Sequence, residues 1–233
     1  MRLNCALVSS FLFVSAVLAE YGDFGGVMYG WDVTDKTVTY ARGDFVVPYP
    51  QVDVVHSAFI IGVGLDGLGT CDASLAAGIR VAITDSHEPD ILAWSEFAPG
   101  ILNWNPSFIV SPGHLLEVIV SLVGPSRTEG YFSIENISTG QKWSEDITNH
   151  PYSLCLGSAY WTVEIYPDGQ TPLANFNQVT FTETLVKHGF PGQRYKPRDH
   201  LTLLKINQNG HDVTSVNLIV RSEATNILVT YIG

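Results

Sequence analysis

Residues 115–140, with the sequence LLEVIVSLVGPSRTEGYFSIENISTG, decide the fold class of this chain. Leu115 to Leu122 and Tyr131 to Ile137 are short runs rich in aliphatic, β-branched and aromatic side chains, which favour extended backbone. Ser138-Thr139-Gly140 follows the second run and has the residues typical of a tight turn. The stretch therefore predicts strands at short spacing, as in an antiparallel sheet.

The same pattern continues on both sides of this segment. Turn residues separate the runs, and no stretch shows sustained 3.6-residue periodicity with helix caps. Lys187 to Asp199 is rich in Gly and Pro and is expected to be a surface loop. We predict an all-β chain that folds as one antiparallel sandwich or barrel. The further predicted strands are Thr37–Tyr40, Phe45–Val47, Ala58–Ile61, Tyr160–Ile165, Val179–Phe181, Leu201–Ile206, Val216–Val220 and Ile227–Ile232, with turns such as Gly64–Gly67, Pro167–Gly169 and Asn209–Gly210.

The first residues predict a secreted protein. Arg2 supplies a positive start, Leu7 to Leu18 form an apolar stretch, and small residues lead up to Ala19. We therefore expect a signal peptide over residues 1–19, with cleavage before Glu20, and a single domain over residues 20–233. The apolar run is too short to span a bilayer, so no membrane association is expected.

Cleavage would remove Cys5 and leave two cysteines, Cys71 and Cys155. In an oxidising compartment two cysteines favour one disulfide, and two free buried thiols are the alternative. Asn136-Ile137-Ser138 is the only sequon without an interfering proline, which makes Asn136 the candidate site of N-glycosylation.

The composition argues against several classes of function. The chain has 23 acidic and 12 basic residues, without a basic cluster that would indicate a nucleic-acid partner. It contains no P-loop, no G-x-S-x-G elbow and no HExxH motif, and its seven His residues are scattered. We expect no metal, no cofactor and a monomeric protein.

One predicted strand carries a carboxyl group in a notable position. Side chains alternate along a strand, so Trp161, Val163 and Ile165 share one face and Tyr160, Thr162 and Glu164 share the other. If the apolar face is buried, Glu164 lies beside a phenol and a hydroxyl, where its pKa can be tuned for acid–base chemistry. Taken alone, the pattern favours a strand glutamate that faces solvent. Glu96, which shares its face with Trp94, has the same ambiguity.

Several ordered segments resemble the eqolisins, the secreted glutamic peptidases of fungi. The residues that carry the resemblance match the family patterns W-V-G-I-D-G…C, W-Y-E-W-Y-P, E-N-x-T-T-G-Q-K, S-L-C…A-E-W-I-V-E and P-F-A-x-F…V-x-F. In this chain they are Gly62–Gly67 with Cys71, Trp94–Pro99, Glu135–Lys142, Ser153–Cys155 with Ala159–Glu164, and Pro172–Phe176 with Val179–Phe181. The resemblance extends from about Phe24 to the last strand. It implies two large bent antiparallel sheets of the concanavalin A-like or jelly-roll type, a Cys71–Cys155 disulfide, and a substrate cleft on the concave face.

The family's mechanism uses a Glu and a Gln on that face. The resemblance assigns Glu164 as the general base that takes a proton from the attacking water and later protonates the leaving amine. The family's Gln aligns with Ala76, and no Gln occurs between Gln51 and Gln141. Losing one oxyanion donor lowers the rate about a hundred- to a thousandfold. The family's first Trp also falls on Gly62. Asp66, Glu96 and Tyr160 are the residues expected to contact a substrate.

Three functions follow from this reading. The first is slow acid proteolysis of a polypeptide, at about pH 2 to 5 if Glu164 has an ordinary pKa, with Tyr160 or a backbone N–H as the substitute donor. The second is a non-catalytic sandwich that binds a peptide or another extracellular ligand in its concave face. The third, a carbohydrate-binding or glycan-cleaving sandwich, is weakest because glucanases need two carboxylates at a defined separation and the E-x-D-x-E strand motif that would supply them is absent.

Overall fold

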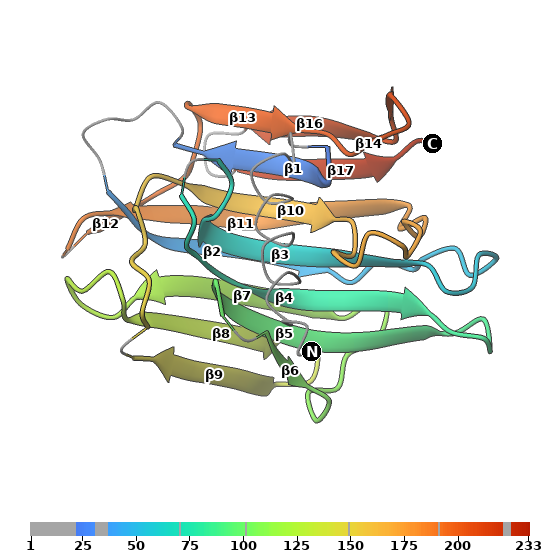
Figure 1. Ribbon diagram of the computed structural model, residues 1–233, viewed down its shortest axis with the longest axis horizontal. Coiled ribbons are helices and arrows are strands. Elements are labelled where there is room, and N and C mark those ends of the chain that lie inside the picture. Colours follow the sequence, from blue (N-terminus) through green and yellow to red (C-terminus); the bar gives the residue numbers. More distant parts are fainter. Residues whose placement is uncertain are drawn as a thin grey trace, which may run out of the picture.

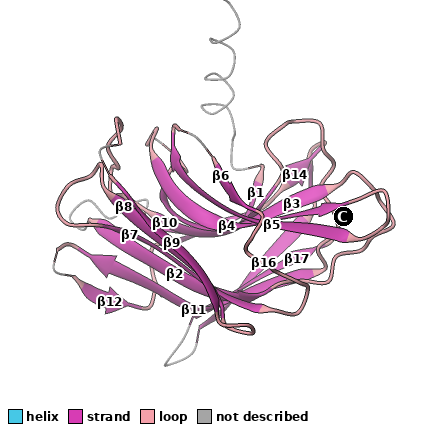
Figure 2. Ribbon diagram, turned by 90° about the horizontal axis from the view of Figure 1, so that it is seen from below, coloured by secondary structure: helices cyan, strands magenta, loops and turns pink. Residues whose placement is uncertain are grey.

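The computed structural model describes residues 22–30, 37–69, 71–100, 102–148, 150–190, 192–220 and 225–233. Within these ranges all regular secondary structure is β-strand. Two large antiparallel sheets lie face to face (Figures 1 and 2). The described residues include no helix with the length and apolar character needed to cross a membrane. The predicted signal peptide, residues 1–19, lies outside the described residues.

One sheet has seven strands in the order β13-β1-β10-β3-β4-β5-β6. Its central strands are long and regular, and each pairs antiparallel with its neighbours. Figure 2 shows both sheets bent in the same sense, with the outer face of the seven-stranded sheet on the hollow side. The strands of this sheet are β1 (Phe24–Tyr29), β3 (Ala58–Asp66), β4 (Ser74–Ile83), β5 (Pro89–Ala98), β6 (Asn103–Asn105), β10 (Ala159–Glu164) and β13 (Leu201–Leu204).

The second sheet has the order β16-β17-β11-β2-β7-β8-β9, and β12 pairs with one end of β11. A separate two-stranded ribbon is formed by β14 (Asn207–Gln208) and β15 (His211–Asp212). The strands of the second sheet are β2 (Val38–Val46), β7 (Leu115–Leu122), β8 (Gly130–Asn136), β9 (Gln141–Ile147), β11 (Gln178–His188), β12 (Gln193–Tyr195), β16 (Thr214–Val220) and β17 (Thr225–Tyr231).

The predicted all-β antiparallel sandwich is confirmed, and the strand predicted over Leu115–Leu122 has those bounds in β7. The predictions omitted β1, β4, β5, β6 and β9, together with the short strands β14 and β15. The two strands predicted over Thr37–Tyr40 and Phe45–Val47 are one strand, β2. Alanine and glycine residues such as Ala76 and Gly78 weaken the strand signal of β4, and polar residues weaken that of β5 and β9. The turn predicted at Gly64–Gly67 begins late, because β3 continues through Asp66. The predicted loop over 187–199 contains the short strand β12.

The two sheets enclose one large apolar core. Trp161 of β10 is fully buried in it, and its indole N–H donates a 2.8 Å hydrogen bond to the carbonyl oxygen of Arg42 in the opposite sheet. Gly43 of β2 makes this approach possible, because a Cβ there would lie 2.6 Å from Cδ1 of Trp161. The contact fixes which face of β10 points inward.

A disulfide joins Cys71, in the segment between β3 and β4, to Cys155, in the segment before β10. This resolves the open alternative between a bond and two free thiols, and it agrees with the pairing that the resemblance implied. The bond spans 84 residues. In the chain-entropy account, closing a loop of this size removes much conformational freedom from the unfolded chain.

We expect the double substitution of Cys71→Ser and Cys155→Ser to lower the free energy of unfolding by about 4–5 kcal/mol. Urea unfolding of the oxidised protein and the double variant measures the difference. Treating the oxidised protein with a reductant should reproduce the same loss. Equal unfolding midpoints for all three samples would contradict the stabilising role of the bond.

Candidate active site

Strand β10 places three polar-tipped side chains on the outer face of the seven-stranded sheet. Trp161 and Val163 belong to the core between the sheets, and the alternation turns Tyr160, Thr162 and Glu164 the other way. The predicted division of this strand into two faces is therefore confirmed. Glu164 therefore lies on the outer face of the seven-stranded sheet and not in the apolar layer between the sheets.

Strand register defines the neighbours of these residues across the sheet. Tyr160 is opposite Gly64, which is opposite Ala76, which is opposite Glu96. One row further along β10, the sequence of partners is Thr162, Gly62, Gly78, Trp94 and Trp104. Because residues paired in register share a face, Glu164, Ala76 and Glu96 all lie on the outer face, with β3 between the strands of Glu164 and Ala76.

The carboxyl of Glu164 is held above the glycine at position 62. Thr162 donates a 2.6 Å hydrogen bond from Oγ1 to Oε1 of Glu164. A Cβ built on Gly62 would lie 3.4 Å from the same Oε1, so the carboxyl lies directly over the backbone of β3 at this glycine. The residue keeps partial solvent contact, which leaves it accessible to a water molecule or a ligand.

Burial raises the pKa of Glu164 to about 7, with Glu96 adding a smaller contribution and the Thr162 hydrogen bond opposing both. A charged carboxylate is disfavoured where protein has replaced water. The group therefore changes its ionisation near neutral pH, well above the range of about pH 2 to 5 expected for a glutamate of ordinary pKa. A carboxyl poised in this way can accept and return a proton.

Tyr160 and Ala76 belong to an apolar cluster on the same face. Both side chains are almost fully buried, and the cluster also contains Met28, Ile60, Leu68, Trp94 and Leu204. The phenol ring of Tyr160 covers Gly64, where a Cβ would lie 2.4 Å from the hydroxyl oxygen. Burial, with Glu164, Glu96 and Asp66 nearby, raises the pKa of Tyr160 well above its usual value, against a hydrogen bond with Ser74. The phenol is therefore a neutral donor.

Glu96 lies opposite Ala76 on β5 and is half-buried. Desolvation alone raises its pKa. The structure thus brings together four of the sequence-predicted positions, Glu164, Ala76, Tyr160 and Glu96, on one face.

Asp66 has contacts of a different kind. Its buried carboxylate accepts hydrogen bonds from the backbone N–H groups of Leu156, Gly157 and Ser158, at 2.7, 2.8 and 3.1 Å. Burial raises its pKa, and these backbone donors oppose the rise. The observed contacts position the segment that leads from Cys155 into β10. These hydrogen bonds are all to the backbone of the chain itself, so the predicted contact between Asp66 and a substrate stays a prediction.

Asn136, the candidate site of N-glycosylation, is enclosed in the folded chain. The side chain is fully buried at the end of β8, and Nδ2 donates to the carbonyl oxygen of Ile109 at 3.0 Å and lies 2.9 Å from Nδ1 of His114. The nitrogen that would carry the glycan is thus enclosed in the folded chain. A sequon pattern alone contains no information about burial.

Two residues of the site were missed by the sequence analysis. Thr162 was placed on the right face, but its bond to Glu164 was not foreseen. Trp94 was noted only as a neighbour of Glu96, yet its indole lies over Gly62, with Cζ2 3.2 Å from the position of an added Cβ. The available signal was the glycine that replaces the family's Trp, which opens space on this face.

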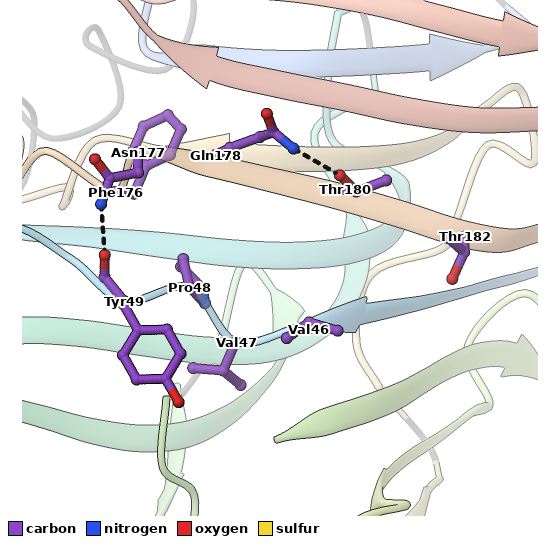
Figure 3. Close-up of a pocket in the computed structure, with 9 residues that line it drawn as sticks. All are labelled: Val46, Val47, Pro48, Tyr49, Phe176, Asn177, Gln178, Thr180 and Thr182. Atoms are coloured by element: carbon purple, nitrogen blue, oxygen red, sulfur yellow. Dashed lines mark hydrogen bonds between the residues drawn. The ribbon is translucent and has the colours of Figure 1, made fainter. Parts of the chain in front are cut away.

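Several cavities lie beyond this cluster in the described parts of the chain, two of them beside different sheets. One, of about 390 Å³, adjoins the same face and is lined by Arg80 and Tyr166 among others. Arg80 lies between the rings of Trp104 and Tyr166, at 5.6 and 6.0 Å from their centroids. The second, of about 410 Å³, lies beside β2 and β11 of the other sheet and contains none of the predicted site residues (Figure 3).

The structure is thus a bent antiparallel β-sandwich with a desolvated glutamate on its outer face. The chain belongs to the peptidase A4 family, whose model matches residues 25–231. No curated protein sequence matches it.

Solved structures of glutamic peptidases are similar over most of the chain. Scytalido-glutamic peptidase with a peptide-based transition-state analogue is 25% identical, with a TM-score of 0.74 over 90% of this chain and 98% of the other. Aspergilloglutamic peptidase from Aspergillus niger is 28% identical, with a TM-score of 0.66 over 75% and 99%. SCP-B, described as a member of the eqolisin family and solved with a tripeptide, is 24% identical and supports the fold, with a TM-score of 0.68 over 90% and 98%. The predicted family is confirmed.

The raised pKa of Glu164 has a consequence for stability. Between pH 4.5 and about 7 an unfolded chain loses this proton while the folded protein keeps it, so stability falls as pH rises through that window. We expect the stability of the wild type relative to a Glu164→Gln variant to fall by at most about 3 kcal/mol between pH 4 and pH 8. Urea unfolding at several pH values measures it. Parallel stability curves for the two proteins would show that the carboxyl is not desolvated.

Proposed function

We propose that this chain is a secreted peptidase of the glutamic type that hydrolyses polypeptides slowly, with Glu164 as the general base. The observation that carries the proposal is the desolvated carboxyl of Glu164 on the hollow face of a peptidase-family sandwich. The related scytalido-glutamic peptidase was solved with a peptide-based transition-state analogue, which supports a polypeptide as the ligand class here. The disulfide is consistent with an extracellular protein.

In the proposed reaction a water molecule loses a proton to Glu164 as its oxygen bonds to the peptide carbonyl carbon. The same proton then passes to the amide nitrogen as the C–N bond breaks, which leaves an acid and an amine. Thr162 holds Oε1 through its 2.6 Å hydrogen bond and so fixes the orientation of the carboxyl. No cofactor enters these steps, and we propose that the protein acts as a monomer.

The pKa sets the pH range of this reaction. A base must be ionised to accept a proton, and the ionised fraction of a group falls about tenfold for each pH unit below its pKa. With a pKa of about 7, Glu164 is a weak base in strong acid and an effective one near neutrality. We therefore propose hydrolysis that rises from acid pH towards neutral pH.

Slow turnover follows from the residue at position 76. We propose that Ala76 occupies the position of the family's catalytic Gln, because it shares the outer face with Glu164. The side chain of alanine cannot donate a hydrogen bond, so the oxyanion donor of the family is missing. A lost oxyanion donor costs about 2.7–4 kcal/mol in the transition state. The same substitution favours a second candidate function, in which the hollow face binds a peptide without cleaving it.

We expect wild-type protein to cleave a denatured protein substrate between pH 2 and 8, with a rate that rises towards pH 7. The substitution Glu164→Gln should abolish cleavage at every pH, because it removes the proton acceptor. Quantifying new amino termini measures the rate. Glu88→Gln, on the exposed turn before β5, is the matched control and should leave the rate unchanged. No cleavage by the wild type at any pH would leave the peptide-binding function.

We expect Ala76→Gln to raise kcat about a hundredfold, because it restores an amide donor on the face of Glu164. Initial rates on a quenched fluorescent peptide measure this, with Ala82→Gln on the same strand as the control. The side chain must fit beside Tyr160, so the melting temperature of each variant is measured in parallel. A folded Ala76→Gln variant with an unchanged rate would rule out Ala76 as the missing donor position.

A further inference from the structure

The indole nitrogen of Trp94 is a buried donor without an acceptor. The side chain is 5% exposed, and its Nε1–H has no hydrogen-bond partner within the described parts of the chain. Burying a polar group without a partner costs free energy, and folded proteins keep few such groups. An unpaired donor in this position is explained if its partner arrives with a ligand.

The indole lies where such a ligand would meet Glu164. A Cβ on Gly62 would be 3.2 Å from Cζ2 of Trp94 and 3.4 Å from Oε1 of Glu164, so the two side chains converge above this glycine. Nε1 is two bonds away from Cζ2 in the indole ring. Gly78, which separates Gly62 from Trp94 in the strand register, has no side chain to intervene. The six-membered ring of Trp94 and the carboxyl of Glu164 therefore border the same small region of the face.

The hydroxyl donors that β10 places on this face are already engaged. The hydroxyl of Thr162 donates to Glu164, and the hydroxyl of Tyr160 has a hydrogen bond with Ser74. Ala76 has nothing to donate. Among these residues of the face, the indole of Trp94 is the side chain whose donor is unused.

We propose that the Trp94 indole N–H donates to the carbonyl oxygen of the peptide bond that is cleaved beside Glu164, and so supplies one of the two oxyanion donors, while the second is missing at Ala76. The inference rests on the proposed function. As the water oxygen bonds to the carbonyl carbon, the π electrons move to the carbonyl oxygen, and the hydrogen bond to Nε1 strengthens. When the C–N bond breaks, that charge returns to re-form the carbonyl, while Glu164 delivers its proton to the amine.

The glycine at position 62 is what permits this arrangement. A side chain there would begin within 3.2–3.5 Å of two atoms of the indole six-membered ring, so a bulky residue would displace Trp94 from its place over β3. Compared with the family pattern, Ala76 in place of Gln removes one hydrogen-bond donor. Gly62 in place of Trp makes room for the indole of Trp94.

The test replaces Trp94 by 3-benzothienylalanine, which keeps the ring shape and has sulfur in place of N–H, and separately by Phe. We expect both variants to lose about a hundredfold in kcat on a quenched fluorescent peptide with KM unchanged, because the bond strengthens only in the transition state. Trp104→Phe, a tryptophan of the same row, is the control and should retain the wild-type kcat.

Stability separates this role from a packing role. The benzothienyl variant removes an unsatisfied donor without changing shape, so its melting temperature should equal or exceed that of the wild type. A purely structural Trp94 would give unchanged kinetics in the benzothienyl variant and a loss of stability in Trp94→Phe. That result would overturn the inference and leave the proposed function intact.

A binding measurement distinguishes failure of the Trp94 role from failure of the proposed peptidase function. The probe is a peptide with a phosphinate in place of one amide, compared by calorimetry with the amide peptide of the same sequence. We expect wild type to prefer the phosphinate, and the benzothienyl variant to lose at least tenfold of that preference. An unchanged preference would overturn the role of Trp94. A wild type that neither prefers the phosphinate nor cleaves peptides would overturn the proposed function as well.

Discussion

The site depends on the packing of Trp161 between the two sheets. Its indole fills the space above Gly43 and bonds to the carbonyl oxygen of Arg42, so β10 cannot rotate or shift by one residue without exposing the largest side chain of the core. Because side chains alternate along a strand, this one contact also places Glu164 on the opposite face. The hydrophobic core therefore determines where the acid lies, and the position of the acid determines the chemistry available to the protein.

The outer face of the seven-stranded sheet has small residues at its centre. Gly62, Gly64, Gly78 and Ala76 lie at adjacent positions of β3 and β4, so large side chains from the flanking strands can lie over them. Tyr160 reaches across from β10, and Trp94 from β5. The resulting apolar surroundings disfavour the charged form of Glu164, which raises its pKa, while Thr162 keeps one carboxyl oxygen bonded. In the proposed function, the desolvation that raises the pKa of Glu164 also makes its ionisation destabilising to the fold.

Much of this could be predicted from the sequence. Alternation in residues 160–165 gave the face of Glu164 correctly, and the runs of β-branched residues gave the antiparallel fold. Sequence patterns do not show which residues become neighbours in three dimensions. Asn136 matched a sequon but is enclosed by contacts from distant segments, and Asp66 matched a site motif but bonds to a loop about ninety residues away. The pKa of Glu164 was beyond prediction because it depends on residues from several strands. Trp94 illustrates the same limit, since the space it occupies arises from a glycine on another strand.

The account requires that one carboxyl on the hollow face keep its proton well above the ordinary range. Carbon-13 NMR of protein labelled at glutamate carboxyls, with the Glu164 resonance assigned from the Glu164→Gln variant, measures this directly. The account expects that resonance to titrate near pH 7, apart from those of the exposed glutamates. A Glu164 resonance that titrates near 4.5, together with the exposed carboxyls, would show that the acid is solvated and would remove the basis for the site.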